Sequence, residues 1–257
     1  MCLIGVSMKM NQQFPFIIAA NRDEFLNRPA LPLHQWSGSP SIYGGQDLKK
    51  GGMWMGVNSE GKVAAITNVR EWPPVKRKKS RGELVKQFLL NEESSEQYLA
   101  HLRKKESEFD GYNLFVGNPD RLVYGSNRNQ DQFVLKEGIY GLSNAALDTS
   151  WPKVERIKHH LSILHSCENR NKLIDELFLA LSDSEPYPKE QLPNTGVGEE
   201  LEKLLSPVFI STPDYGTRSS TVIVMDRNRH LSIVERRYEE GKTFETTFEL
   251  QIPGQKS

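Results

Sequence analysis

The sequence predicts an α+β fold in which antiparallel sheets carry layers of helices. Runs of β-branched and aromatic residues gather in three blocks along the chain, and amphipathic helical patterns gather in two blocks between them. The chain of 257 residues is long enough to bury a large core. A regular alternation of single strands and helices would instead predict a parallel βαβ winding. We therefore expect one domain that spans residues 1–257.

The first block of strands is predicted at the N-terminus. The segments CLIGVSM and FPFIIAAN are rich in residues that favour strands, and the polar stretch KMNQQ connects them. They predict an antiparallel hairpin. With its turn at residues 11 and 12, paired residue numbers sum to about 23, which places Cys2 opposite Asn21 with Asp23 just beyond.

The second block begins with a shorter hairpin. Strands are predicted at 54–58 and 63–68, joined by SEGK, where Gly61 can adopt a positive φ angle. After a basic connection that contains prolines, the segments SRGELVKQFLL and SSEQYLAHLRKK have helical periodicity. Ser94 or Ser95 is a candidate cap of the second helix.

The rest of the chain repeats this order of strands, helix pair and strands. Strands are predicted in YNLFVG, RLVYGS, QFVLKE and IYGLSN. Two helices follow at 151–165 and 171–181, with Ser150 and Pro152 at the start of the first. The polar segment SDSEPYPKEQLPNTGVG is typical of a long loop. The final strands are predicted at 220–226, 231–238 and 244–250.

The composition argues against several classes of protein. Lys and Arg number 33 and Asp and Glu number 33, so no net charge attracts nucleic acid or an anionic membrane, and neither partner is expected. The apolar stretch 14–20 is far too short to span a bilayer. The first residues also lack the continuous apolar segment of a secretory signal. We therefore expect no membrane insertion and a cytoplasmic location.

The two cysteines, Cys2 and Cys167, occur without a CxxC pair or a regularly spaced set of histidines. This pattern argues against a disulfide framework and against a structural zinc site. His159 and His160 are adjacent on a predicted helix, so their side chains diverge and do not form a metal-binding pair. No metal and no cofactor are expected.

Cys2 directly follows the initiator Met. If Met1 is removed, Cys2 carries both a thiol and a free α-amine, whose pKa of about 7.7 to 8.0 leaves part of it unprotonated at neutral pH. The nucleophile and its base then reside in one residue, which is the arrangement of N-terminal nucleophile hydrolases. The simpler alternative is a small apolar residue at the start of a buried strand.

The stretch AANRDEFLNRPA places polar groups at the far end of the hairpin, beside the expected position of Cys2. Asp23 can hydrogen-bond the α-amine of Cys2 and orient it. Arg22 can favour the thiolate by lowering the pKa of Cys2. The alternative is a solvated turn with an Asx motif and alternating charges.

Four ordered motifs resemble those of one known family. NRDE close behind MC, GGMWMGVNSEGKVAAITNVR, GLSNAALDTSWPKV and YGTRSSTVIVMD look like the NRDE family, also called the transport and Golgi organisation protein 2 family, over residues 2–238. That family is similar to cysteine N-terminal nucleophile hydrolases such as penicillin V acylase and conjugated bile acid hydrolase. The resemblance implies a four-layered αββα sandwich of two antiparallel sheets.

The resemblance also implies roles for particular residues. Cys2 would be the nucleophile and Asp23 the partner of its amine. Asn144 in LSNA would match the asparagine whose amide helps form the oxyanion hole. Asn68 in AITNVR would be a second polar contact to the intermediate, and Arg218 in YGTRSST a cation near the nucleophile. The structural alternatives for the last three are a cap, the end of a hairpin and a surface ion pair.

One departure from the acylases concerns their catalytic cation. They have an arginine three residues before this aspartate, where this sequence has Ala20. The cation would therefore come from Arg22 or Arg218, or be absent.

The leading hypothesis is an N-terminal cysteine amidohydrolase that cleaves a linear amide bond of a small, partly apolar molecule. The alternative is a non-catalytic intracellular carrier or organiser that handles haem or a lipid metabolite, with the secretory and Golgi links that the family name implies for eukaryotic relatives. The expected partner is thus a small-molecule amide or a hydrophobic metabolite.

Overall fold

The structure is a computed structural model that describes residues 2–73, 77, 79–129 and 132–254. In these residues the strands form two antiparallel sheets. The first sheet has the order β10 (Gly138–Leu142), β1 (Cys2–Met8), β2 (Phe16–Phe25), β11 (Tyr215–Met225), β12 (His230–Glu239) and β13 (Lys242–Gln251). The second has the order β3 (Ala30–Trp36), β4 (Ile42–Asp47), β5 (Met55–Asn58), β6 (Val63–Asn68), β7 (Tyr112–Asn118), β8 (Arg121–Ser126) and β9 (Gln132–Val134).

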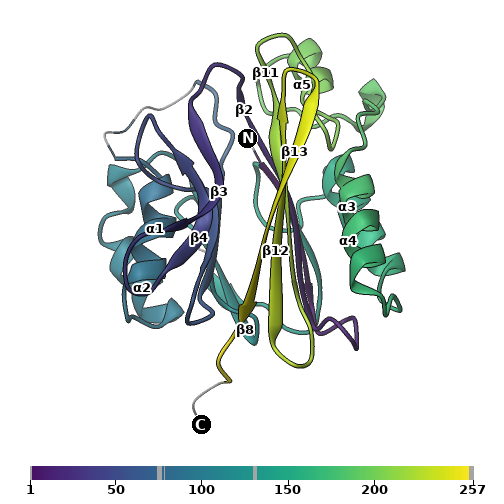
Figure 1. Ribbon diagram of the computed structural model, residues 1–257. Helices are drawn as coiled ribbons and strands as arrows, with labels where there is room; N and C mark the ends of the chain where they lie inside the picture. The colour runs from purple at the N-terminus through teal and green to yellow at the C-terminus, as the bar shows by residue number, and fades with distance from the viewer. Residues whose placement is uncertain (1, 74–76, 78, 130–131, 255–257) are drawn as a thin grey trace.

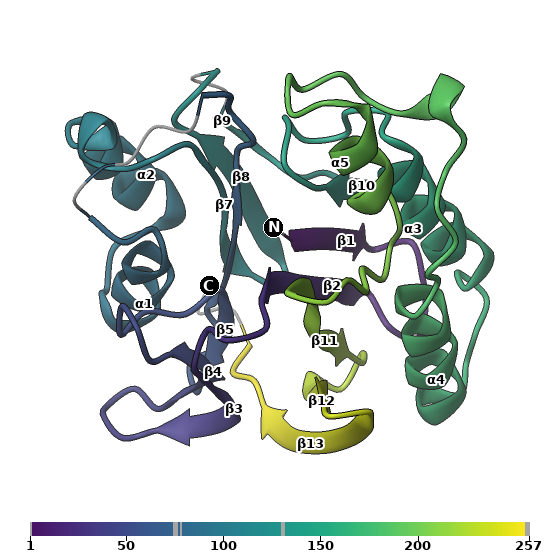
Figure 2. The same ribbon diagram turned by 90° about the horizontal axis from the view of Figure 1, so that it is seen from above.

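Helices cover the outer face of each sheet. The helices are α1 (Gly82–Leu90), α2 (Ser95–Arg103), α3 (Pro152–Ile163), α4 (Arg170–Leu181) and α5 (Glu199–Leu204). Short 3₁₀ helices lie at Glu106–Glu108 and Lys189–Gln191. Figure 1 shows α1 and α2 on one side and α3 and α4 on the other, with the two sheets between them. Figure 2 shows the same stacking from above, which is the αββα arrangement that the resemblance implied.

The alternation of side chains along β1 and β2 sorts residues between two cores. Ile4 and Ile18 belong to the buried cluster between the sheets, whereas Leu3 and Ile17 belong to the cluster under α3 and α4. Successive residues of a strand point to opposite faces, so both faces of this pair are apolar and buried. Strands β1 and β2 are therefore buried on both faces, by the second sheet on one side and by α3 and α4 on the other.

Gly5 lets α3 approach β1 closely. A Cβ atom at this position would lie 2.8 Å from side-chain carbons of both Ile157 and Leu161. No larger residue fits there without moving the helix. Asn11, beyond the end of β1, donates from Nδ2 to the carbonyl oxygen of Leu164, just after α3, at 3.0 Å, so the first turn of α3 lies close to the start of β1.

The helices largely match their predicted positions. The capping box at the start of α2 uses Ser94, which confirms one of the two predicted caps. The prediction that Ser150 caps the next helix is wrong, because the residue that precedes α3 is Trp151 and no side chain caps it. Asn169 caps α4 with its side chain.

Several elements were not predicted. Strands β3 and β4 contain few residues that favour strands. ALPLHQW contains a proline and a histidine, and IYGGQD contains two glycines. The short helix α5 follows the predicted loop. Strand β11 begins at Tyr215 rather than at residue 220, because its polar first half pairs with β2.

The predicted register of the first hairpin is wrong by one residue. Cys2 lies opposite Arg22, and Asn21 lies opposite Leu3. A shift of one residue exchanges the two faces of a strand. Arg22 therefore shares the face of Cys2, and Asn21 points the other way.

The physical reason lies in the connection between the two strands. The loop from Lys9 to Pro15 is centred on the single residue Gln12, since Met8 pairs with Phe16. The backbone nitrogen of Lys9 donates to the carbonyl oxygen of Pro15 at 2.7 Å. A loop with an odd number of residues changes the pairing by one relative to a two-residue turn.

No helix in the described part of the chain is long and apolar enough to cross a membrane.

Candidate active site

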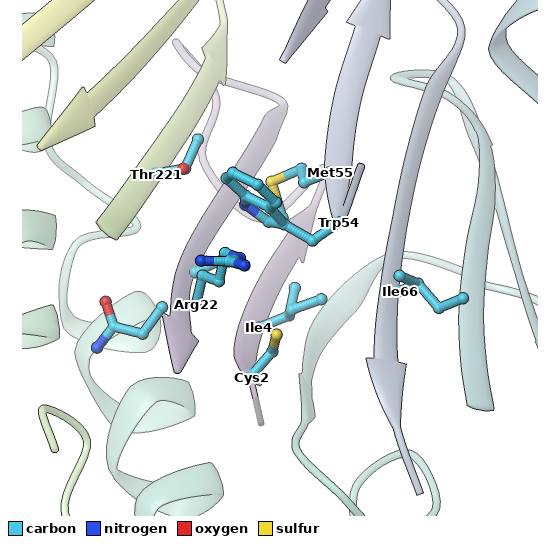
Figure 3. A pocket seen from close by; sticks show the side chains of 9 residues that line it. Cys2, Ile4, Arg22, Trp54, Met55, Ile66 and Thr221 are labelled. Atoms are coloured by element: carbon cyan, nitrogen blue, oxygen red, sulfur yellow. The ribbon is translucent and has the colours of Figure 1, made fainter. Parts of the chain in front are cut away.

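The thiol of Cys2 faces the space between the sheets. Ile4, two residues further along β1, belongs to the inter-sheet core, and side chains at this spacing share a face. Cys2 is half-buried, and it lines a pocket with Ile4, Arg22, Trp54, Ile66 and Thr221 (Figure 3). We call this the Cys2 pocket.

The Cys2 pocket is small. The lining side chains nearly fill it, and the cavity that remains is about 10 Å³, the room of about one water molecule. Typical small-molecule sites have volumes of roughly 300 to 1,000 Å³. A ligand that reaches the thiol would therefore have to move the side chains that line the pocket.

Arg22 supplies a cation on the same face. It is buried, and its guanidinium carbon lies 4.3 Å from the centroid of the Trp54 ring (Figure 3). This cation–π contact holds the charge against the apolar wall of the Cys2 pocket. Arg22 thus lies on the same side of the sheet as the Cys2 thiol, two residues after Ala20.

The charge of Arg22 does not leave the thiol ionised. Burial raises the pKa of the Cys2 thiol above its ordinary value, and Arg22 opposes this rise without overcoming it. Arg22 thus acts on the pKa of Cys2 in the expected direction, and burial decides the net direction. Any nucleophilic attack by this sulfur would therefore require a base that removes the thiol proton.

Asp23 lies at the amino end of Cys2. It is the next residue of β2 after Arg22, the partner of Cys2, in the direction of the start of β1. One of its carboxyl oxygens accepts a 2.7 Å hydrogen bond from the hydroxyl of Thr217 on β11. Burial raises the pKa of the Asp23 carboxyl.

The face of β2 on which Asp23 lies determines whether its carboxyl can contact the backbone nitrogen or the thiol of Cys2. By the alternation along β2, its side chain lies on the helix-covered face, opposite the face of the Cys2 thiol. The backbone nitrogen of Cys2 lies at the end of the strand and is not confined to either face. The carboxyl of Asp23 is therefore suited to this nitrogen rather than to the sulfur.

Asn144 and Asn68 meet beside Cys2. Asn144 is buried, and its Nδ2 donates to the backbone carbonyl oxygen of Asn68 at 2.9 Å. The preceding residue, Ser143, donates from Oγ to the carbonyl oxygen of Cys2 at 3.2 Å. An amide nitrogen has two N–H donors, so the bond to Asn68 uses one of them.

Arg218 lies at a bulge of β11. Its Nη1 donates to the carbonyl oxygens of Phe25, Leu26 and Arg28 at 3.1, 2.7 and 3.2 Å. The guanidinium thereby secures the turn that follows β2. Its role as a cation near the nucleophile stays a prediction.

Asn21, the first residue of the NRDE motif, anchors β2 to the helical layer. Its Nδ2 donates to the carbonyl oxygens of Leu181 at 2.8 Å and of Val208 at 2.9 Å. Its Oδ1 accepts a 2.6 Å hydrogen bond from the hydroxyl of Ser220. These contacts give Asn21 a structural role.

Replacing Asn21 with alanine is expected to lower the free energy of unfolding by about 2–3 kcal/mol, because buried polar groups lose their hydrogen-bond partner. Urea unfolding followed by circular dichroism measures the change. The exposed Asn228 provides the control, and Asn228→Ala should change the free energy of unfolding by less than about 0.5 kcal/mol. Equal stability of the two variants would contradict the anchoring role.

The structure adds residues that the sequence analysis did not single out. Ser143 lies within the motif GLSNAALDTSWPKV, directly before Asn144. Lys153 is the next-to-last residue of the same motif, and it is buried in the first turn of α3. One feature of the sequence could have indicated that Lys153 is buried. It precedes the buried Ile157 by four residues and so takes a core-facing position on the helix.

Relatives of known family match this chain over most of its length. The family model for Transport and Golgi organisation 2 matches residues 1–240. The Transport and Golgi organization protein 2 homologs of Bos taurus and Homo sapiens are 34% identical to this chain, over 244 and 240 residues respectively. Both matches cover 87% of this chain and 86% of the relative.

A solved structure shares the fold. A mutant of the conjugated bile acid hydrolase from Clostridium perfringens matches with a TM-score of 0.54 at 8% sequence identity, over 96% of this chain and 92% of that chain. At this identity the likeness shows the fold alone, which is that of the N-terminal nucleophile hydrolases. By its sequence match and its motifs, this chain belongs to the Transport and Golgi organisation 2 family.

Proposed function

We propose that this protein is an N-terminal cysteine amidohydrolase that cleaves a linear amide bond of a small, partly apolar molecule. One observation carries the proposal: Cys2 lines a pocket, and the carboxyl-bearing Asp23 lies at the amino end of the same residue. Removal of Met1 would turn the nitrogen of Cys2 into an α-amine beside this acidic group. A thiol and an amine on one residue are the reagents that acyl transfer requires.

The first half of the reaction forms an acyl-enzyme. The α-amine accepts the proton of the Cys2 thiol, and the sulfur attacks the amide carbon of the substrate. The remaining N–H of Asn144 can stabilise the negative oxygen of the tetrahedral intermediate, and Asn68 fixes the position of that amide. The ammonium then donates its proton to the leaving nitrogen as the carbon–nitrogen bond breaks, which leaves a thioester.

The second half regenerates the enzyme. The α-amine takes a proton from water, the resulting hydroxide attacks the thioester carbon, and the carbon–sulfur bond breaks to release a carboxylic acid. The sulfur recovers its proton from the ammonium. Arg22, which lies on the side of the thiol, favours the negative charge that develops on sulfur in both halves.

Intact-mass measurement of the protein from its native host tests the requirement for a free amine. We expect a mass lower by one methionine, with Cys2 at the N-terminus. Incubation with a panel of short N-acyl amines, with amine release as the readout, then tests turnover. Retention of Met1 in every molecule would overturn the mechanism, because the α-amine would then belong to the wrong residue.

A second candidate is a non-catalytic carrier of haem or a lipid metabolite. The raised pKa of Cys2 and the alanine at position 20 favour it, since both leave the thiol less activated than in an acylase. The carrier predicts saturable binding of haem, seen as a shift of the Soret band, without amide cleavage. Amide turnover without such binding would reject it.

A further inference from the structure

Lys153 is a buried cation that the mechanism above does not use. Its side chain is 2% exposed, and its Nζ donates to the carbonyl oxygen of Leu205 at 2.8 Å. An ammonium has three N–H donors, so this bond satisfies one of them. A buried charge is costly unless an opposite charge lies near it.

The packing of α3 determines where this ammonium lies. Ile157 and Leu161 face β1 at Gly5. Lys153 precedes Ile157 by four residues, so it shares this face of the helix one turn earlier. The end of α3 lies at the end of β1, because Asn11 Nδ2 donates to the carbonyl oxygen of Leu164 at 3.0 Å, so the first turn of α3 lies near the start of β1. The Asp23 side chain lies on the same helix-covered face of the sheet, one residue beyond the partner of Cys2. The charges of Asp23 and Cys2 both act on the Lys153 ammonium.

Charged groups from other elements also face Lys153. Arg70, which follows β6, and Glu202 of α5 both act on it. Arg70 Nη1 and Glu202 Oε2 are 2.6 Å apart, so these two charges largely offset each other. Asp23 is therefore the acidic group whose charge chiefly balances Lys153.

The effects of the two residues on each other are reciprocal. Burial lowers the pKa of Lys153 to about 8, and Asp23 is the strongest charge that opposes this shift. Burial raises the pKa of Asp23, and Lys153 is the strongest charge that opposes that shift. Arg22 favours the ionised form of Asp23 more weakly, and Tyr215 also lies within electrostatic range of this carboxyl.

We propose that Lys153 is a positioning residue that keeps the Asp23 carboxyl ionised at the amino end of Cys2. This inference rests on the proposed function, in which Asp23 holds the α-amine. An ionised carboxyl accepts hydrogen bonds from the ammonium form of the amine, whereas a protonated carboxyl is neutral and loses this attraction. Lys153 thus supports the base of the reaction without touching the substrate.

Titration of Asp23 tests the proposal without any substrate. The carboxyl carbons of the full-length protein are labelled with ¹³C, and the Asp23 resonance is assigned by its loss in Asp23→Asn. In Lys153→Met the resonance should titrate at a pH higher by about one unit or more, because an adjacent cation typically lowers a carboxyl pKa by about 1–3 units. In Lys153→Arg, which keeps the charge, the titration should stay close to that of the wild type.

Lys158→Met is the matched control. Lys158 lies on the same helix, and its Nζ pairs with Asp148 at 2.8 Å. Its replacement should leave the Asp23 titration unchanged. An Asp23 resonance that titrates identically in Lys153→Met and the wild type would overturn the proposal, whether or not the protein cleaves amides.

A reciprocal measurement applies if Lys153→Met does not fold. With ¹³C at the ε carbon of lysine, Lys153 should titrate near pH 8 in the wild type. In Asp23→Asn its titration should move to lower pH, because the favourable negative charge is gone. An unchanged lysine titration would overturn the coupling. A shift in a protein that cleaves no amide would support the coupling and count against the proposed function instead.

Discussion

Replacing Cys2 with alanine is expected to abolish amide cleavage while the protein stays folded. The substitution removes the sulfur that forms the acyl-enzyme, and loss of a covalent nucleophile typically lowers kcat by about 10⁴-fold or more. Cys2 is half-buried at the first described position of β1, so losing one sulfur atom should cost less than about 1 kcal/mol of folding free energy. Turnover of an N-acyl amine and thermal unfolding measure the two effects.

Cys167→Ala provides the control for this substitution. Cys167 is also half-buried, and its sulfur donates to the carbonyl oxygen of Asn169 at 3.4 Å, away from the Cys2 pocket. This variant should keep the wild-type rate. Full activity in Cys2→Ala, or equal losses in both variants, would show that the reaction does not use Cys2.

Replacing Asn144 with alanine is expected to lower kcat by about 10²–10³-fold, the usual result of removing one oxyanion-hole donor. The Michaelis constant should change little, because the donor acts on charge that develops only during the reaction. Asn144 also donates to Asn68, so thermal unfolding must show that the variant is folded at the assay temperature.

Asn228→Ala, at an exposed turn, is the control for Asn144→Ala and should keep the wild-type rate. A rise in the Michaelis constant at constant kcat would assign Asn144 to substrate binding instead. An unchanged kcat and Michaelis constant would remove Asn144 from the site.

Much of the fold was predictable because local patterns decide it. The two buried faces of the first hairpin appear as nearly continuous apolar runs, and the helices show amphipathic periodicity with recognisable caps such as Ser94. Strands β3 and β4 were missed because their residues have little intrinsic preference for strands. They form because their backbone groups pair with each other and with β5.

The sequence named candidate members of the site and did not determine their arrangement. A single-residue error in register exchanged the faces of Asn21 and Arg22. Sequence reasoning therefore could not separate the structural residue of the NRDE motif from the cation beside the thiol. Lys153 was missed because a lysine in a first helical turn is usually exposed, and only its surroundings make it unusual.

The sequence by itself determined the order of most strands and helices, the motifs that identify the family, and the presence of a thiol and a potential amine on Cys2. These depend on residue type and short-range spacing. Only the tertiary structure decided that Cys2 lies beside Arg22, that the pKa of Cys2 is raised, and that Lys153 is buried within electrostatic range of Asp23. Each of these depends on burial and on contacts between residues far apart in the chain, because electrostatic energies are set by distance and solvent exposure in space.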